Sequence, residues 1–221
     1  CSVSIADGLA LVGSEYAVSA GKGSGAAYLF DADPGSATFG AQLAKFAARN
    51  GGSGDRFGIS VSLNDGRALV GAPFHERPVF FPSKNEGAAY LFDADPGSAT
   101  FGALLADLLP APTYPHHKGL GCSVSLDGPF AAVGSPWEAY PGPGKGTIRE
   151  SGTAYVFDVD TSSPNFSKPH SKFQNAVPGY KDYFGNSLCI QNGVLVVGAP
   201  EDDTWKSDGG SVFVTRIVAL R

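Results

Sequence analysis

Short runs of alternating apolar and polar residues recur along the chain and predict β-strands. Residues 59–63 read ISVSL, and the apolar run that follows them ends in Val-Gly at Gly71. Alternation with a period of two places successive side chains on opposite faces of a strand. Pro73 ends the second run, because proline has no amide hydrogen to donate to a sheet ladder. Residues 88–92, AAYLF, are bounded by glycine and aspartate and predict a third short strand.

The same succession of segments occurs four times. Each copy has an alternating first segment, a second segment that ends in Val-Gly, and an aromatic third segment. The Val-Gly glycines lie 58, 63 and 64 residues apart, at Gly13, Gly71, Gly134 and Gly198. A period of this length predicts a repeat architecture.

The predicted repeats differ in how closely they match one another. The stretch GAAYLFDADPGSATFGA occurs letter for letter at residues 25–41 and 87–103, so the first two repeats resemble a recent duplication. The expected repeat boundaries are 1–54, 55–118, 119–181 and 182–221.

A fourth segment in the first three repeats completes the predicted sheet. It begins near Phe39, Phe101 and Ser171. Residues 101–109, FGALLADLL, would also suit a short helix, but a helix there would break the strand count of the repeat. Four short antiparallel strands per repeat predict an all-β fold, a β-propeller built of four-stranded blades. A β-sandwich stays an alternative, although it gives no reason for the sequence to repeat.

Composition narrows the class of protein. The 30 glycines and 16 prolines suit tight turns between strands, and 43% hydrophobic residues suffice for a core. The net charge of -5 gives no electrostatic reason to expect nucleic acid or anionic lipid as a partner. Cys1, Cys122 and Cys189 are too few for a disulfide framework and are expected to be small buried side chains. Because the chain starts with cysteine and contains no methionine, we expect a trimmed piece of a longer polypeptide. No window reaches 18 consecutive apolar residues, so no membrane span is expected in this segment.

The motifs resemble a known repeat. The second repeat, FGISVSLNDGRALVGAP followed by GAAYLF, resembles the FG-GAP repeat of the integrin alpha-subunit propeller, and the segment that starts at Phe184 matches it equally well. The first and third repeats depart from it, with VGSE and VGSP in place of VGAP. In that family seven repeats usually close one propeller. The resemblance therefore implies further blades from the parent chain or a partner subunit, and a closed ring of four is the alternative.

Metal binding is expected at most in one loop. Calcium-binding members of the family carry several carboxylates between the first two strands, whereas the corresponding loops here offer about one each, at Asp7, Asp65 and Asp127. These aspartates are interpreted as turn formers, so the repeats resemble the calcium-free type and no cofactor is expected from these loops. The densest acidic loop follows Gly198, and its weak candidate ligands are Asp202, Asp203 and Asp208. A solvated loop is the alternative interpretation.

No catalytic constellation is present in the sequence. There is no Gly-x-Ser-x-Gly elbow or phosphate-binding loop, and the adjacent His116 and His117 have no nearby cysteine for zinc. The Asp31–Asp33, Asp93–Asp95 and Asp158–Asp160 pairs recur in three repeats and are interpreted as strand ends that lead into turns. A weak cation site or an acid/base pair is the alternative interpretation. The protein is therefore not expected to be an enzyme.

The loops after the second segments vary while the segments around them repeat. A propeller places such loops on one rim, where binding residues gather. The candidate ligand-binding residues are Tyr16, Phe74, His75, Phe80, Phe81, Trp137, Tyr140 and Trp205.

These loops suggest a function. Aromatic residues on loops favour recognition of protein or of sugar rings. Together with the resemblance, they imply an extracellular or cell-surface binding or adhesion module, with Asn165 in an Asn-Phe-Ser sequon as its glycosylation site. The alternatives are a structural set of blades within a larger assembly and a propeller enzyme, such as a polysaccharide lyase or hydrolase.

Overall fold

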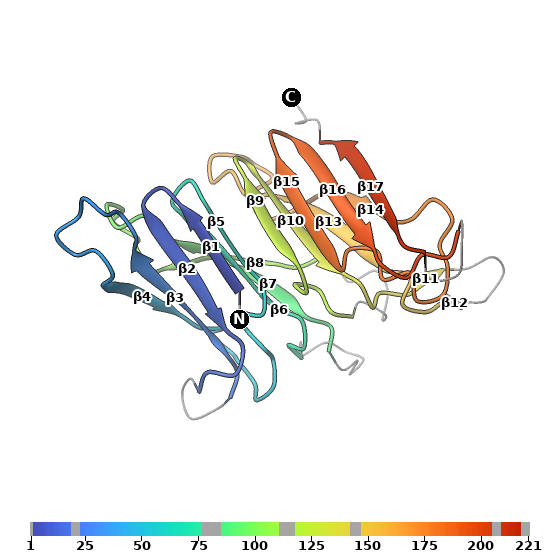
Figure 1. Ribbon diagram of the computed structural model, residues 1–221, viewed down its shortest axis with the longest axis horizontal. Coiled ribbons are helices and arrows are strands. Elements are labelled where there is room, and N and C mark those ends of the chain that lie inside the picture. The colour runs from blue at the N-terminus through green and yellow to red at the C-terminus, as the bar shows by residue number, and fades with distance from the viewer. Residues whose placement is uncertain are drawn as a thin grey trace.

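The computed structural model describes residues 2–18, 23–76, 85–110, 118–141, 147–204 and 209–217. Within these residues the chain forms strands and no helix, and the sheets follow one another along the long axis (Figure 1). No helix in this part of the chain has the length and apolar character needed to cross a bilayer.

Four antiparallel sheets follow the order of the sequence. The first contains β1 (Ser2–Ala6), β2 (Leu9–Ser14), β3 (Ala26–Asp31) and β4 (Gln42–Phe46). The second contains β5 (Val61–Asn64), β6 (Arg67–Ala72), β7 (Ala88–Asp93) and β8 (Leu104–Leu108). The third contains β9 (Val124–Asp127), β10 (Phe130–Ser135), β13 (Thr153–Asp158) and β14 (Pro169–Phe173). The fourth contains β15 (Ser187–Gln191), β16 (Val194–Ala199) and β17 (Ser211–Arg216), and a small hairpin pairs β11 (Tyr140–Pro141) with β12 (Thr147–Ile148).

The prediction of four-stranded antiparallel sheets is confirmed for the first three repeats. Each sheet is a meander, which is the topology of a propeller blade. The helical alternative for residues 101–109 is excluded, because β8 pairs with β7 in antiparallel register. The fourth sheet shows three strands within the described residues, and the number of blades in a closed ring stays a prediction.

Tight turns join the first two strands of each sheet. Asp7 and Gly8 have φ of 52° and 72°, and Asp65 and Gly66 have φ of 51° and 66°. Two successive positive φ values define a type I′ turn, whose twist matches that of the flanking strands. This geometry supports the interpretation of Asp7 and Asp65 as turn formers.

Serines of the alternating first segments join neighbouring sheets. The first strands β1, β5, β9 and β15 lie side by side. The hydroxyls of Ser2, Ser60 and Ser123 donate to the carbonyls of Gly58, Gly121 and Gly185 in the next sheet, at 3.0, 2.7 and 2.7 Å. The Ser-x-Ser pattern therefore serves contacts between sheets.

The Phe-Gly pair at the start of a repeat contacts the repeat that precedes it in the chain. Phe57 is fully buried, forms an isolated bridge with Gly25, and packs against Tyr90 at 5.4 Å between ring centroids. Gly58 has φ of 89°, a conformation that favours glycine. The core thus lies between sheets, as expected for blades that bury their faces against neighbours.

The two end sheets expose apolar side chains. Val3 and Ile5 of β1 are 66% and 71% exposed, and Val212 and Val214 of β17 are 68% and 62% exposed. The expectation that Cys189 is buried is wrong: it is exposed on the outer face of the last sheet, at the position where Ser125 meets the next sheet in the third repeat.

Candidate functional site

The loops after β2, β6, β10 and β16 leave the sheets at the same end, and we call this end the loop rim. Each loop begins with the same turn, in which an amide bonds to the carbonyl three residues earlier. The residues that donate this amide are Ala17, His75, Glu138 and Asp202. These four residues hold equivalent backbone positions and differ only in their side chains.

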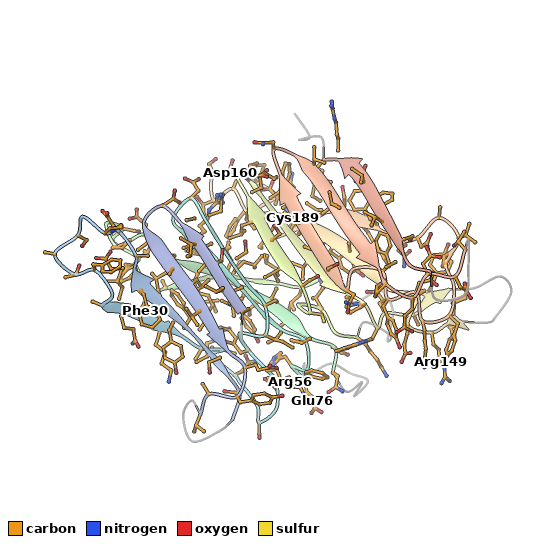
Figure 2. All side chains as sticks on the ribbon, viewed as in Figure 1. Phe30, Arg56, Glu76, Arg149, Asp160 and Cys189 are labelled. Atoms are coloured by element: carbon orange, nitrogen blue, oxygen red, sulfur yellow. The ribbon has the colours of Figure 1, made fainter. Side chains whose placement is uncertain are left out.

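A row of side chains crosses the loop rim over three successive sheets. The guanidinium carbon of Arg56 lies 5.4 Å from the ring centroid of Tyr16 and 4.8 Å from that of Phe74. The rings of Phe74 and Trp137 are 5.2 Å apart. We call Tyr16, Arg56, Phe74 and Trp137 the aromatic row. Figure 2 shows Arg56 and Glu76 at this rim and Asp160 at the opposite end of the sheets.

Backbone geometry places Arg56 in this row. Arg56 has φ of 55°, and its counterparts Gly119 and Tyr183 before the next two sheets have φ of 79° and 52°. Arg56, two positions before Gly58, has left-handed backbone geometry, and this turns the chain between Asp55 and the buried Phe57. Glu15 Oε2 forms an ion pair with the Arg56 guanidinium, at 3.5 Å from Nη1.

The members of the row differ in exposure. Tyr16 is 68% exposed, whereas Phe74 and Trp137 are half-buried. A Cβ atom at Gly119 would lie 2.3 Å from the Trp137 ring, so this indole packs directly on the backbone. Trp137 therefore contributes one accessible part of its surface to the rim and buries the rest.

A hollow of about 380 Å³ opens beside Phe74. Its lining includes Asn50, Asp55, Phe74, His75, Glu76 and Asn85. At its base the Nδ1 atom of His75 lies 2.6 Å from Asp55 Oδ2, and its Nε2 atom lies 3.3 Å from Asn50 Nδ2. His75 and Asp55 are both 4% exposed, so His75 lies beneath the rim surface.

In the third repeat, Glu138 holds the backbone position that His75 holds in the second. Glu138 is 3% exposed, and its two carboxylate oxygens accept hydrogen bonds of 2.8 and 2.9 Å from the Tyr155 hydroxyl. The Lys172 ammonium donates to Glu138 Oε1 at 2.9 Å. The buried charge is compensated by a lysine of the same sheet.

The fourth repeat gathers three carboxylates at this position. One oxygen from each of Asp182, Asp202 and Asp203 lies within 4.8 Å of the others. Asp182 is fully buried and Asp202 is 4% exposed, whereas Asp203 is exposed. The Asn175 amide donates to Asp182 at 3.1 Å and to Asp202 at 2.8 Å, and so bridges two of these carboxylates.

The pKa values of the two buried carboxylates, Asp182 and Asp202, are shifted in opposite directions. Burial raises the pKa of Asp182 above its ordinary value, and the neighbouring charge of Asp202 raises it further. Burial also acts to raise the pKa of Asp202, but hydrogen bonds from Ser211 and Thr204 lower it by more, so that it lies below its ordinary value.

The predicted site residues are thus only partly brought together. Tyr16, Phe74 and Trp137 share the aromatic row, His75 lies under it, and half-buried Tyr140 lies in the separate β11–β12 hairpin. Phe80, Phe81, Trp205, the candidate ligand Asp208, and the pair His116 and His117 fall outside the described residues.

Sequence reasoning missed Arg56, Asp55 and Asp182 as members of these sites. The available signal was the Asp-x-Phe-Gly pattern that precedes the second and fourth sheets. In both repeats the aspartate accepts an amide hydrogen bond from the residue three positions earlier, from Gly52 at 2.8 Å and from Gly179 at 2.6 Å.

The paired aspartates after β3 and β7 act within turns. Asp93 accepts hydrogen bonds from Ser98 and Thr100 at 2.5 Å each and from the Asp95 amide at 3.0 Å. Asp31 makes the same contacts with Ser36, Thr38 and Asp33. Their oxygens are committed to the turn, which supports the turn interpretation of these pairs.

Two segments of the chain are similar to a known repeat family. Residues 41–92 and 179–215 match the FG-GAP repeat. A search of curated proteins found no match. Among solved structures, the crystal structure of the computationally designed Ika4 protein matches with a TM-score of 0.53 and 12% identity, over 98% of this chain and 90% of that chain. At this identity the likeness concerns the fold alone.

Proposed function

We propose that this protein is a binding module whose loop rim recognises a protein or a glycan, because residues 41–92 and 179–215 match the FG-GAP repeat and the sheets are arranged like propeller blades. The proposal assigns it no catalytic activity. The observation that carries it is the aromatic row, which joins three successive repeats at one rim.

The chemistry of the aromatic row suits recognition. Aromatic faces stack on apolar side chains and on the apolar faces of sugar rings, and the Arg56 guanidinium adds fixed donors. The hollow beside Phe74 offers the amides of Asn50 and Asn85 and the carboxylate of Glu76 as polar groups for the same ligand. A mostly rigid scaffold with few polar groups around an aromatic platform is typical of binding sites.

An extracellular or cell-surface location, with a role in adhesion, is part of the proposal. The sequon residue Asn165 is exposed in the turn between β13 and β14, where a glycan would meet solvent. Its attachment is tested by mass spectrometry of the protein from its native source before and after enzymatic deglycosylation.

Further blades are proposed to cover the end sheets. The exposed valines and isoleucine of β1 and β17 lie where inner sheets of the array bury their faces against a neighbour. We propose that blades from the parent chain or a partner subunit cover them, which keeps apolar surface from water. Replacement of Val212 and Val214 by lysine should abolish this association in sedimentation analysis.

Binding is tested by a glycan array and a screen of matrix proteins. A ligand found there should bind Tyr16→Ala and Arg56→Ala at least roughly tenfold more weakly, because removal of a central contact residue costs more than about 1 kcal/mol. Phe39→Ala is the matched control, since Phe39 is 62% exposed on a turn at the other end of the sheet. Silence in both screens, or equal loss with Phe39→Ala, would leave the structural set of blades as the better function.

A further inference from the structure

Equivalent backbone positions in three repeats carry different ionisable side chains under the rim. His75, Glu138 and Asp202 each donate the first turn amide of the rim loop and accept an amide from the glycine before the third strand. Their side chains point to a polar site under the rim. The differences between these three polar sites do not depend on any ligand that the rim binds.

In the second and third repeats a basic group meets the buried carboxylate. Asp55 has the imidazole of His75 at 2.6 Å. Glu138 has the Lys172 ammonium at 2.9 Å. A buried carboxylate needs such a partner or several hydrogen bonds, because its transfer out of water is costly.

The fourth repeat keeps the carboxylate and lacks the basic partner. Asp182 matches Asp55, since each accepts the amide three residues before it, but Asp202 stands where the second repeat has His75. Among the described residues no cationic side chain forms an ion pair with Asp182, Asp202 or Asp203. Replacing an imidazole with a carboxylate leaves two buried acids side by side.

A second observation points to a ligand at this place. The Oδ1 atom of Asp182 is buried and has no hydrogen-bond partner in the part of the chain that the structure describes. Asp202, in contrast, accepts hydrogen bonds from Thr204, Ser211 and Asn175. Asp182 therefore keeps one buried oxygen that no described group of the protein binds, while hydrogen bonds hold the Asp202 carboxylate in place.

We propose that Asp182, Asp202 and Asp203 form a site for a divalent cation, with calcium as the best fit. Asp182 supplies a buried oxygen, Asp203 supplies an exposed carboxylate at the entrance, and Asp202 adds negative charge and orientation. Calcium accepts several carboxylate oxygens together with water in a flexible geometry, which suits ligands from a loop and from a preceding segment. The site lies after β16, at the end of the sheet opposite the β15–β16 turn.

Calcium binding is measured by isothermal titration of the chelator-treated protein with CaCl₂, alongside thermal melting with and without chelator. We expect a single site with Kd on the order of 10⁻⁴–10⁻³ M, the range of extracellular calcium modules. The melting temperature should rise by several degrees as calcium is added, because the ion binds only the folded form. Magnesium, which demands a stricter octahedral geometry, should bind more weakly.

Two substitutions locate the site. Asp203→Asn should weaken calcium binding at least about tenfold while leaving the buried network untouched. Asp202→His installs the imidazole of the second repeat and should abolish the calcium response while keeping the fold, as judged by circular dichroism. Asp107→Asn is the control, because Asp107 is an exposed acid of β8 that belongs neither to this site nor to the aromatic row.

Three results would overturn the proposal. The first is a melting temperature unchanged by calcium, magnesium and chelator, which would mean that a proton or hydrogen bonds alone stabilise the acidic pair. The second is an equal loss of binding in Asp107→Asn, and the third is calcium binding that survives in Asp202→His and Asp203→Asn. None of these results bears on ligand recognition by the aromatic row, which is tested with other variants.

Discussion

The hydroxyl of Ser60 donates a hydrogen bond of 2.7 Å to the carbonyl oxygen of Gly121 and so joins the starts of two neighbouring first strands. The same contact links Ser2 with Gly58 and Ser123 with Gly185. Apolar faces between sheets supply most of the attraction, and this hydrogen bond sets how one sheet is placed on the next. Neighbouring sheets therefore keep one relative position along the array.

Ser60→Ala should destabilise the protein by about 1 kcal/mol, the usual net contribution of one intramolecular hydrogen bond. Urea unfolding measures the change. Ser187→Ala is the matched control, because Ser187 holds the equivalent place on the exposed end sheet and its loss should cost less than about 0.5 kcal/mol. Equal losses for both variants would show that the contact between sheets contributes nothing.

Gly71→Ala should destabilise the fold by at least about 3 kcal/mol, because overpacking against backbone cannot relax through a rotamer change. A Cβ atom at Gly71 would lie 1.9 Å from the carbonyl oxygen of Gly121 and 2.4 Å from the Ser60 hydroxyl oxygen. Gly23→Ala has no atom within 4 Å of the new methyl group and serves as the control. Thermal melting of both variants checks the prediction, and a Gly71→Ala protein as stable as Gly23→Ala would contradict it.

The Asp93 turn should stabilise the protein at neutral pH and lose this effect in acid. Burial acts to raise the pKa of Asp93, but hydrogen bonds from Ser98 and Thr100 lower it by more, so that it lies below the ordinary value of 3.8. A carboxyl with a lowered pKa in the folded state stabilises that state above the ordinary value, and the stabilisation is lost as pH falls through the folded pKa.

The double variant Ser98→Ala, Thr100→Ala tests this turn. Its unfolding free energy should be lower than that of the parent protein at pH 7, and the difference should shrink well below the ordinary value of 3.8, where Asp93 is protonated. Urea unfolding across this pH range is the measurement. A difference that does not change with pH would mean that the hydroxyls act by packing alone.

His75→Asp should destabilise the second repeat by about 3 kcal/mol or more at neutral pH, because it removes the partner of a buried carboxylate. Asp55 would then face a second carboxylate in place of the imidazole at 2.6 Å. His75→Asn, which keeps a polar side chain of similar size and adds no charge, should cost less. Urea unfolding ranks the two, and the reverse order would contradict the argument.

Cys189 should react with a maleimide several times faster than Cys122. Cys189 is exposed, whereas Cys122 is partly buried and burial raises the pKa of its thiol, which lowers the fraction of reactive thiolate. Mass spectrometry of timed samples, in a Cys1→Ser background, gives both rates. Faster labelling of Cys122 would show that the outer face of the last sheet is covered.

Much of the fold was predictable because the signals are local. Alternation in residues 59–63 and the stop at Pro73 predict strand positions without knowledge of neighbours, and Asp65 followed by glycine predicts the turn between them. Residues 101–109 were ambiguous, since their apolar run fits a helix or a strand. Pairing of β8 with β7 decided the question, because the edge of β7 needs hydrogen-bond partners.

The sites were less predictable because their members come from separate segments. Tyr16 and Trp137 were candidates from loop composition, but Arg56 joins the row only because a left-handed backbone turn brings it between two sheets. Asp202 and Asp203 were recognised as an acidic loop. Asp182, the buried member, precedes them by about one strand pair, and only the Asp-x-Phe-Gly pattern that it shares with Asp55 marked it in the sequence.

By itself, the sequence determined the number of repeats, the order of their strands and the turns between them, since periodicity and glycine or proline positions act over a few residues. Tertiary structure decided which charges meet beneath the rim. His75, Glu138 and Asp202 occupy one backbone position, yet their surroundings differ, because each side chain faces whatever acid, lysine or amide the packing of its own repeat brings within hydrogen-bond reach.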